Sequence, residues 1–151
     1  MTESENNFFI RPLALSEAHL ASSSEREALA NEAWSEEGII DTLKLNGHYL
    51  AAFLNNEYVG HIGCTVVLDE GYITNVAVLK NFRRQGVASL LIKALIEKAT
   101  ALKLSFLSLE VRQSNTAAIL LYEKHGFKLC GKRPNFYKNP DEDALIMTLN
   151  F

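Results

Sequence analysis

The stretch YITNVAVLKNFRRQGVAS, residues 72–89, decides the fold class of this chain. Its first half is rich in β-branched residues and predicts a strand over Ile73–Val78, which a cationic loop follows. Apolar residues at helical spacing then predict an amphipathic helix over Gly86–Lys103. A second strand over Phe106–Val111 and a second helix over Thr116–His125 repeat the alternation. Strands and helices in this succession build a sheet that is covered by helices.

The segment before residue 72 predicts one strand, two helices and the rest of an antiparallel meander. Ser16 is the predicted start of the first helix, and a capping box of Ser24 and Glu27 predicts that this helix restarts there. Ser35 is the predicted cap of the second helix, Glu36–Leu45. The pattern then changes to period two, without any glycine-rich dinucleotide or nucleotide-phosphate motif. The predicted strands are Asn7–Arg11, Tyr49–Leu54 and Tyr58–Leu68.

The end of the chain predicts two more strands, Phe127–Arg133 and Ala144–Leu149. A polar segment, Asn135–Asp143, is the predicted loop between them. Asn115 is the predicted cap of the helix that precedes them. Because no repeat, low-complexity tract or linker interrupts the pattern, residues 1–151 are predicted to form a single mixed α/β domain.

Composition and charge exclude several classes of function. The chain has 151 residues, of which 48% are hydrophobic and 22% charged, as in a globular domain. A net charge of −3 argues against direct nucleic-acid binding, which depends on clustered Lys and Arg. Met1–Asn7 is polar and acidic, so no signal peptide is expected, and no apolar run approaches the roughly 18 residues of a membrane span. Cys64 and Cys130 are expected to be free buried thiols, which indicates a cytoplasmic protein.

The loop RRQGVA, Arg83–Ala88, has the features of a phosphate site. Unpaired N–H groups at a helix start favour an anion, and glycine at position 86 lets backbone approach a ligand. Arg83 and Arg84 add charge that can meet a phosphate. The alternative is a solvated cationic turn before a surface helix, and these six residues alone do not decide between the two.

Two side chains further along the chain are candidates for acid–base chemistry. Glu110 is a carboxylate in a strand with mostly apolar neighbours, where burial raises a carboxyl pKa. Its alternative role is to end the strand or to pair with Arg112. Tyr122 lies seven residues after Asn115, on nearly the same face of the predicted helix. Its phenol can donate a proton, and its alternative role is that of a core tyrosine.

Taken together, these motifs resemble a known family. Arg83-x-x-Gly86-x-Ala88, between the strand NVAV and a long helix, resembles the acyl-CoA signature of the GNAT acetyltransferase superfamily. The resemblance covers essentially the whole chain and implies a mostly antiparallel sheet of about seven strands with about four helices. The runs WSEE, LEVRQSNTAAILLYEKHGF and FYKNPDEDALIMTL are similar to the bacterial family that acetylates the N-terminal alanine of ribosomal small-subunit protein eighteen.

This resemblance implies acetyl-CoA as co-substrate, no metal, and direct attack of an amine on the thioester in a ternary complex. Glu110 and Tyr122, twelve residues apart, match the general base and the general acid. Trp34 and Tyr137 match the walls of the site for a peptide N-terminus. The residues that are expected to hold acetyl-CoA are Val76, Ala77, Val78, Arg84, Gln85, Gly86, Val87, Ala88, Ser89 and Asn115.

Three features depart from the family pattern. Ala33 stands where proline is common, and Ala88 takes the place of the last signature glycine, which the motif permits. The loop around Lys138–Pro140 is short and rich in asparagine, and because this loop shapes the peptide site, it affects the acceptor more than the catalyst. An acetyltransferase for a protein lysine or a small-molecule amine therefore stays open. A non-catalytic acyl-CoA-binding module is the alternative of a different class, disfavoured because both acid–base candidates are present.

Overall fold

Eight strands form one continuous sheet in the computed structural model, which describes residues 2–3 and 7–151. Their order is β1-β2-β3-β4-β5-β6-β8-β7, and all neighbours are antiparallel except β5 and β6. This confirms the predicted mixed α/β class and its mostly antiparallel sheet with four α-helices. The strands are β1 (Thr2–Glu3), β2 (Phe8–Pro12), β3 (Gly47–Leu54), β4 (Glu57–Val67), β5 (Glu70–Val78), β6 (Phe106–Arg112), β7 (Lys128–Tyr137) and β8 (Glu142–Asn150).

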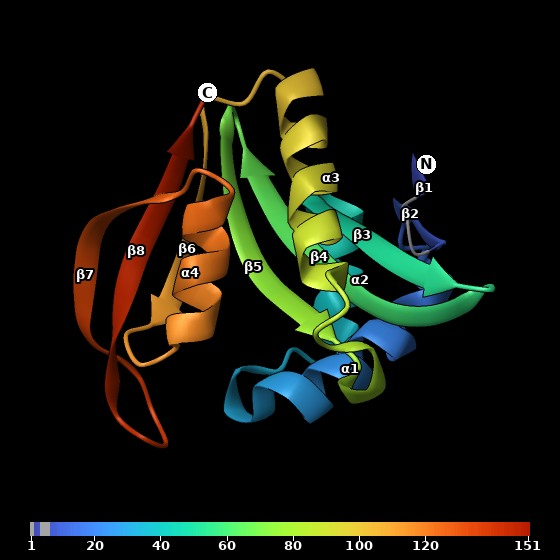
Figure 1. Ribbon diagram of the computed structural model, residues 1–151, viewed down its shortest axis with the longest axis horizontal. Coiled ribbons are helices and arrows are strands. Elements are labelled where there is room, and N and C mark those ends of the chain that lie inside the picture. Colours follow the sequence, from blue (N-terminus) through green and yellow to red (C-terminus); the bar gives the residue numbers. More distant parts are fainter. Residues whose placement is uncertain (1, 4–6) are drawn as a thin grey trace.

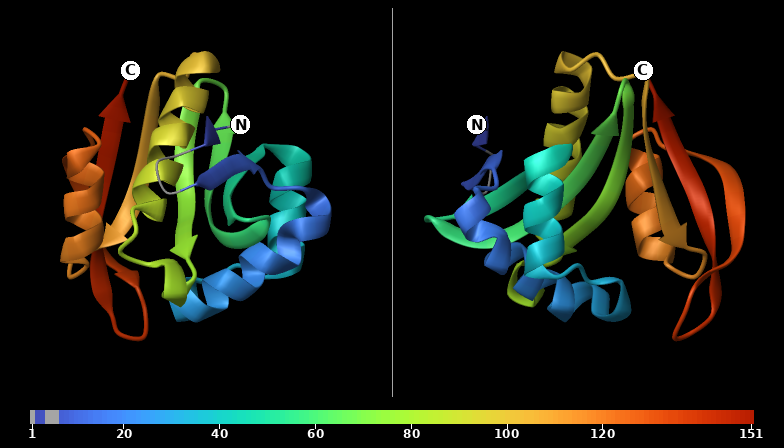
Figure 2. Two further views of the ribbon diagram at one scale, coloured as in Figure 1. Left: turned by 45° about the vertical axis from the view of Figure 1, so that its right-hand side comes forward. Right: turned by 180° about the vertical axis from the view of Figure 1, so that it is seen from behind.

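In the described part of the chain, four α-helices cover the two faces of the sheet (Figures 1 and 2). Helices α3 and α4 lie over one face, and α2 lies over the other with α1 below it. The α-helices are α1 (Ala18–Leu29), α2 (Glu36–Leu45), α3 (Val87–Ala101) and α4 (Thr116–Lys124). Three short 3-10 helices are η1 (Leu15–Glu17), η2 (Ala30–Glu32) and η3 (Lys80–Phe82). Within the described residues, no helix is both long enough and apolar enough to span a membrane.

Each face of the sheet has its own apolar core. The larger core lies under α3 and α4 and contains the fully buried Leu91 and Leu107. The smaller core lies against α1 and α2 and contains Ile39 and Phe53. Burying one such side chain stabilises the fold by roughly 1.5–3 kcal/mol. The sheet is therefore held from both sides, and its central strands have a fixed position.

Strands β5 and β6 part along their length (Figure 1). Residues 70–72 pair in parallel with residues 106–108, and the ladder between the two strands ends there. From Ile73 to Val78, β5 pairs only with β4 on its other side. The separation exposes a strand edge in the middle of the sheet, close to the start of α3.

Two of the predicted helix caps are confirmed and two are wrong. The Ser35 hydroxyl accepts a hydrogen bond from the Gly38 N–H, and the Asn115 side chain accepts one from Ala118. Ser16, in contrast, lies inside η1. Ser24 is buried within α1, because the helix continues unbroken through it. The Glu27 carboxylate accepts a hydrogen bond from the Lys80 N–H and does not cap its own helix.

The predicted loop Asn135–Asp143 is also wrong. Strand β7 continues to Tyr137 and β8 begins at Glu142, so the connection has only four residues. The register between the strands shifts after Arg133, and the Asn135 N–H donates to the Asp143 carboxylate at 2.8 Å. Polar and proline residues suit this irregular strand because it lies at the exposed edge of the sheet.

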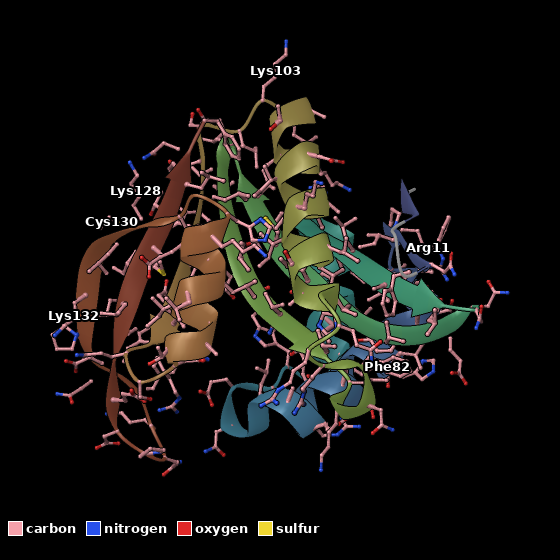
Figure 3. All side chains as sticks on the ribbon, in the orientation of Figure 1. Arg11, Phe82, Lys103, Lys128, Cys130 and Lys132 are labelled. Atoms are coloured by element: carbon pink, nitrogen blue, oxygen red, sulfur yellow. The ribbon has the colours of Figure 1, made fainter. Side chains whose placement is uncertain are left out.

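Both cysteines are free thiols, as expected, but only one is buried. Burial raises the pKa of the Cys64 thiol to about 11, so this thiol is protonated and unreactive near neutral pH. Cys130 is exposed on β7, between Lys128 and Lys132 at the outer edge of the sheet (Figure 3). The prediction of burial is wrong for Cys130 because the residue lies on an edge strand. The absence of a signal peptide, predicted for Met1–Asn7, falls mostly outside the described residues.

We expect Glu17→Gln to lower stability at neutral pH by about 1 kcal/mol. The Arg11 guanidinium, with help from the Ala14 N–H, holds the pKa of the Glu17 carboxyl at about 2. A pKa that is lowered in the folded state contributes stability above the unfolded value of about 4.3. The stability difference from wild type should therefore narrow as the pH falls from about 4.3 towards about 2. Urea unfolding at pH 7, 4 and 3 measures this, and equal stability at pH 7 would contradict it.

Candidate active site

The free edge of β5 presents the backbone of two predicted cofactor residues. Residues directly opposite each other in an antiparallel ladder alternate between pairs that exchange hydrogen bonds and pairs that do not. The Leu79 N–H donates to the Val59 carbonyl at 2.9 Å, so the same alternation gives the Ala77–His61 pair its ladder bonds. Val76 and Val78 therefore direct their N–H and C=O groups away from β4, towards the side where β6 has separated. Ala77 does not.

The two arginines of the cationic loop have different surroundings. The Arg83 Nε donates to the Val78 carbonyl at 3.0 Å, so its guanidinium lies against the last residue of β5. Arg84 has a positive φ of 62° and is exposed. Both side chains are exposed, and of the two Arg83 is the one that is held to β5 by a hydrogen bond.

Helix α3 starts at Gly86 without a capping side chain. Gly86 has φ 81°, in the left-handed region that favours glycine, and a Cβ placed there would meet nothing within 4 Å. The first N–H groups of a helix have no partner within the helix. The start of α3, at Val87 and Ala88, therefore combines unpartnered donors, the positive end of the helix dipole and open space, which suits a phosphate.

Ser89 has a side-chain contact that the sequence did not predict, and Asn115 has the helix cap that it did predict. The Ser89 hydroxyl lies 2.7 Å from His125 Nε2, which joins the start of α3 to the end of α4. Burial, with Lys124 and Lys93 nearby, lowers the pKa of His125. Its side chain is therefore mostly neutral at pH 7. The Asn115 carbonyl oxygen caps α4, which leaves the amide NH₂ of that side chain as its donor for a ligand.

Glu110 lies in the middle of β6, opposite Ile146 of β8. Its side chain is half-buried and points to the opposite face from Leu109 and Val111, which belong to the core under α3 and α4. The suggested pairing with Arg112 is wrong, because the Arg112 guanidinium bonds to other carboxylates. In the described part of the chain, the Glu110 carboxylate has no ion-pair partner.

Tyr122 lies on α4 and reaches the other face of the sheet. Its side chain is 8% exposed and packs edge-on against Phe127, with the ring centres 5.7 Å apart. Burial, and secondarily Tyr137, raises the pKa of Tyr122 above its ordinary value, so the phenol keeps its proton in the neutral range. No hydrogen-bond partner for this hydroxyl is found in residues 2–3 and 7–151.

Tyr137 interacts electrostatically with both Glu110 and Tyr122. Burial and then the Glu110 charge raise the pKa of Tyr137 to about 12, and Tyr137 in turn contributes to the raised pKa of Tyr122. Tyr137 is thus within electrostatic range of both Glu110 and Tyr122, and Glu110 lies on the part of β6 that has separated from β5.

Trp34 lies at the junction of η2 and α2, where a buried polar cluster holds its backbone. Glu25 Oε1 accepts from the Trp34 N–H at 2.8 Å and from the Asn75 amide at 3.0 Å. Glu25 Oε2 lies 2.7 Å from His61 Nε2, and His61 also bonds to the Tyr58 hydroxyl. Glu25 and His61 are fully buried, so this cluster fixes the junction relative to β5. Sequence reasoning missed it; the one signal was a histidine within an apolar strand.

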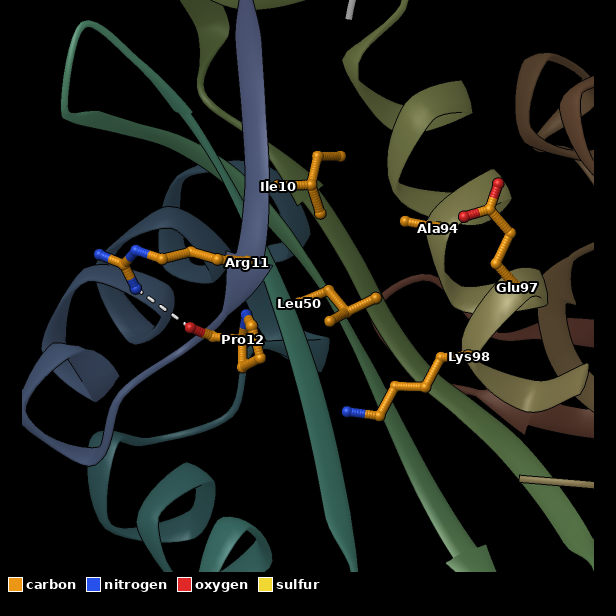
Figure 4. A pocket seen from close by; sticks show the side chains of 7 residues that line it. All are labelled: Ile10, Arg11, Pro12, Leu50, Ala94, Glu97 and Lys98. Carbon is orange, nitrogen blue, oxygen red and sulfur yellow. Dashed lines mark hydrogen bonds between the residues drawn. The ribbon is translucent and has the colours of Figure 1, made fainter. Parts of the chain in front are cut away.

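A hollow elsewhere on the molecule contains none of the predicted residues (Figure 4). It lies between β2, β3 and the second half of α3, and Ile10, Leu50 and Ala94 line its apolar part. Among the described residues, no group of three or more His, Cys, Asp or Glu side chains is placed to hold a metal ion.

A mixed sheet whose central strands part beside an uncapped, glycine-led helix is the architecture of acyl-CoA-dependent N-acetyltransferases. Residues 12–127 match the profile of the acetyltransferase (GNAT) family. The chain belongs to this family.

Relatives narrow the class further. The putative [ribosomal protein bS18]-alanine N-acetyltransferase of Bacillus subtilis is 35% identical over 116 residues, covering 76% of this chain and 77% of the relative. The Haemophilus ducreyi enzyme of that name is 42% identical over 108 residues, covering 66% and 74%. These relatives confirm the resemblance to the ribosomal alanine N-acetyltransferases.

Solved structures agree with the fold. The ribosomal-protein-S18-alanine N-acetyltransferase from Escherichia coli superposes with a TM-score of 0.89 at 33% identity, covering 95% of this chain and 93% of that one. A GNAT family acetyltransferase from Elizabethkingia anophelis with acetyl-CoA bound superposes with a TM-score of 0.81 at 26% identity, covering 98% and 100%.

Proposed function

We propose that this protein transfers the acetyl group of acetyl-CoA to the α-amine of an N-terminal alanine on a ribosomal small-subunit protein. Residues 1–151 act as one GNAT domain, and transfer is direct, in a ternary complex of enzyme and both substrates. The names of the relatives support the acceptor, and the bound acetyl-CoA of a structural neighbour supports the donor. The acceptor is a peptide N-terminus, and neither nucleic acid nor a membrane takes part. The enzyme acts in the cytoplasm.

The observation that carries this proposal is that Glu110 and Tyr122 lie on opposite faces of the sheet, and that Glu110 lies beyond the point where the β5–β6 ladder ends. A thioester that lies along the free edge of β5 has its carbonyl carbon between the two side chains. Glu110 takes a proton from the attacking amine on one side. Tyr122 donates a proton to the sulfur on the other side as the C–S bond breaks. The products are the N-acetyl amide and the free thiol of coenzyme A.

The remaining predicted residues hold the two substrates. Val76 pairs with the pantetheine arm through its N–H and C=O groups, and Val78 pairs through its N–H, because the Val78 carbonyl already accepts from Arg83. The start of α3, with Arg84 and Gln85 before it, takes the pyrophosphate. The Asn115 amide takes a further contact to coenzyme A, and Trp34 and Tyr137 border the acceptor. Holding both substrates together supplies a large part of the rate enhancement.

An α-amine suits this catalyst better than a lysine does. The α-amino pKa is about 8 and the lysine pKa about 10.4, so deprotonation at neutral pH costs roughly 3 kcal/mol less for the α-amine. A carboxylate without a metal can supply the remaining driving force.

We expect Arg84→Glu to weaken acetyl-CoA binding by about tenfold or more, because it places a negative charge beside the pyrophosphate site. Calorimetric titration with acetyl-CoA measures the change. Arg133→Glu, on β7 outside the site, is the charge-matched control. Equal affinity of wild type and the Arg84→Glu variant would contradict the phosphate assignment.

A panel of amines tests the acceptor. The wild-type protein is assayed with acetyl-CoA and three kinds of acceptor: a peptide with an N-terminal alanine, the same peptide with a blocked N-terminus and a free lysine, and a polyamine. We expect acetylation of the first alone. Preference for lysine or polyamine would replace the proposed acceptor, and acetyl-CoA binding without any transfer would indicate a non-catalytic module.

A further inference from the structure

Arg112 ends β6 two residues after Glu110 and lies on the same face of the strand. Its guanidinium donates in two directions. On one side, Nε donates to Glu32 of η2 at 2.8 Å. On the other side, its remaining nitrogens donate to three acceptors at the β7–β8 turn: the Lys138 carbonyl at 2.9 Å, the Pro140 carbonyl at 3.0 Å and the Glu142 carboxylate at 3.2 Å.

These contacts join two segments that are far apart in sequence. The β7–β8 turn and η2 approach each other at one end of the sheet (Figure 1). The Asn31 amide donates to the Asn139 carbonyl at 3.2 Å, which forms a second link between them. We call Arg112, Glu32, Glu142 and the Asn31–Asn139 link the wall bridge. It joins the segment before Trp34 to the hairpin that carries Tyr137.

The wall bridge also fixes the Tyr137 ring. The Arg112 guanidinium carbon lies 4.5 Å from the centre of this ring, a cation–π distance. Tyr137 is the residue that interacts electrostatically with both Glu110 and Tyr122. The Arg112 side chain therefore contacts η2, the β7–β8 turn and the Tyr137 ring.

The surroundings favour a geometric role for Arg112 over a simple charge. Its side chain is 18% exposed, and it bonds to four acceptors in a planar arrangement that lysine cannot reproduce. The other oxygen of Glu142 accepts from the Ser114 N–H at 2.6 Å, so the bridge extends to the residue before Asn115.

We propose that Arg112 is a positioning residue for the acceptor: the wall bridge keeps η2 and the β7–β8 turn at the separation that presents an amine to Glu110. This rests on the proposed function, because it assigns these two segments as acceptor walls. Arg112 touches no reacting atom, and its effect passes through Tyr137 and the two walls.

Arg112→Lys keeps the charge and loses the planar set of bonds. We expect the KM for the acceptor to rise about tenfold or more, kcat to fall less than about threefold, and the Kd for acetyl-CoA to stay unchanged. Arg133→Lys is the matched control, because Arg133 lies on the same hairpin and stacks on Phe136, with 5.7 Å between guanidinium carbon and ring centre. It should change none of these constants.

A milder variant guards against a loss of folding. Glu32→Gln, at a side chain that is 35% exposed, weakens only the link to η2 and should raise the acceptor KM about threefold. In the double variant with Arg112→Lys, the two effects should be less than multiplicative, because both changes break the same contact.

The failure of this inference is distinguishable from the failure of the proposed function. The assays use whichever amine the wild-type protein acetylates fastest in the panel. An acceptor KM equal to wild type in both variants overturns the inference, as does a matching rise in the Kd for acetyl-CoA. If Arg112→Lys does not fold, Glu32→Gln alone decides, and a KM equal to wild type overturns the inference. Acetylation of a lysine or polyamine alone overturns the proposed acceptor, while the KM comparison still decides the role of Arg112. If no amine is acetylated, both proposals fail.

Discussion

Replacing Glu110 with glutamine is expected to lower kcat by about 10³-fold, because a general base contributes about 10²–10⁴-fold to a proton-transfer step. Glutamine keeps the size of the side chain and removes its ability to take a proton. The carboxylate has no ion pair in the described part of the chain, so stability should stay close to wild type. The Kd for acetyl-CoA should also stay unchanged, since Glu110 lies on the opposite face from the core under α3.

Steady-state kinetics with the alanine peptide, together with titration of acetyl-CoA, make this measurement. Glu97→Gln is the control, because it removes an exposed carboxylate on α3 away from the predicted site. Wild-type turnover in Glu110→Gln would remove Glu110 from the mechanism. A lost affinity for acetyl-CoA would assign it to the cofactor instead.

Replacing Tyr122 with phenylalanine is expected to lower kcat by about 10²-fold through loss of the proton for the departing thiolate. Burial raises the pKa of Tyr122 above its ordinary value of about 10, so the hydroxyl is protonated at every pH up to that value. The loss should therefore be the same factor at pH 7 and pH 9. Removing a hydroxyl that has no partner in the described residues should leave the fold unchanged.

Tyr72→Phe is the matched control for this experiment, since Tyr72 is an exposed tyrosine whose hydroxyl bonds to Glu70. A loss that varies with pH between 7 and 9 would indicate that Tyr122 titrates in that range. Undiminished turnover in Tyr122→Phe would show that solvent or another group protonates the thiolate.

The sequence was sufficient wherever the determinant is local. Strand β5, the glycine at the start of α3 and the Asn115 cap depend on residues within a few positions of each other, and all three are as expected. The helix starts at Ser16 and Ser24 were wrong because tertiary packing decided them: Ser24 is buried inside a continuous helix.

The contacts between distant segments were beyond sequence reasoning. The sequence suggests Arg112 only as a partner for the nearby Glu110, whereas its Nε bonds to Glu32, 80 residues earlier in the chain. Glu25 meets His61 and Asn75 only because α1 packs onto β4 and β5. Neither pairing has a spacing in the sequence that marks it.

The placement of the acid–base pair also needed the structure. The twelve-residue separation of Glu110 and Tyr122 is compatible with many arrangements. Their positions on opposite faces follow from the alternation of β6 and from Tyr122 lying in the same core as Leu107 and Leu109. The sequence predicts the cofactor edge as three consecutive residues. The register of β4 and β5 and the contact of Arg83 to the Val78 carbonyl reduce its free backbone groups to the N–H and C=O of Val76 and the N–H of Val78.

The central claim is that this enzyme acetylates the N-terminal alanine of a ribosomal small-subunit protein. Mass spectrometry of intact ribosomal proteins from a strain that lacks the gene tests it most directly. We predict that one small-subunit protein with an alanine N-terminus loses the mass of an acetyl group, that the wild-type gene restores it, and that the Glu110→Gln gene does not. Unchanged acetylation of every ribosomal N-terminus in that strain would contradict the claim.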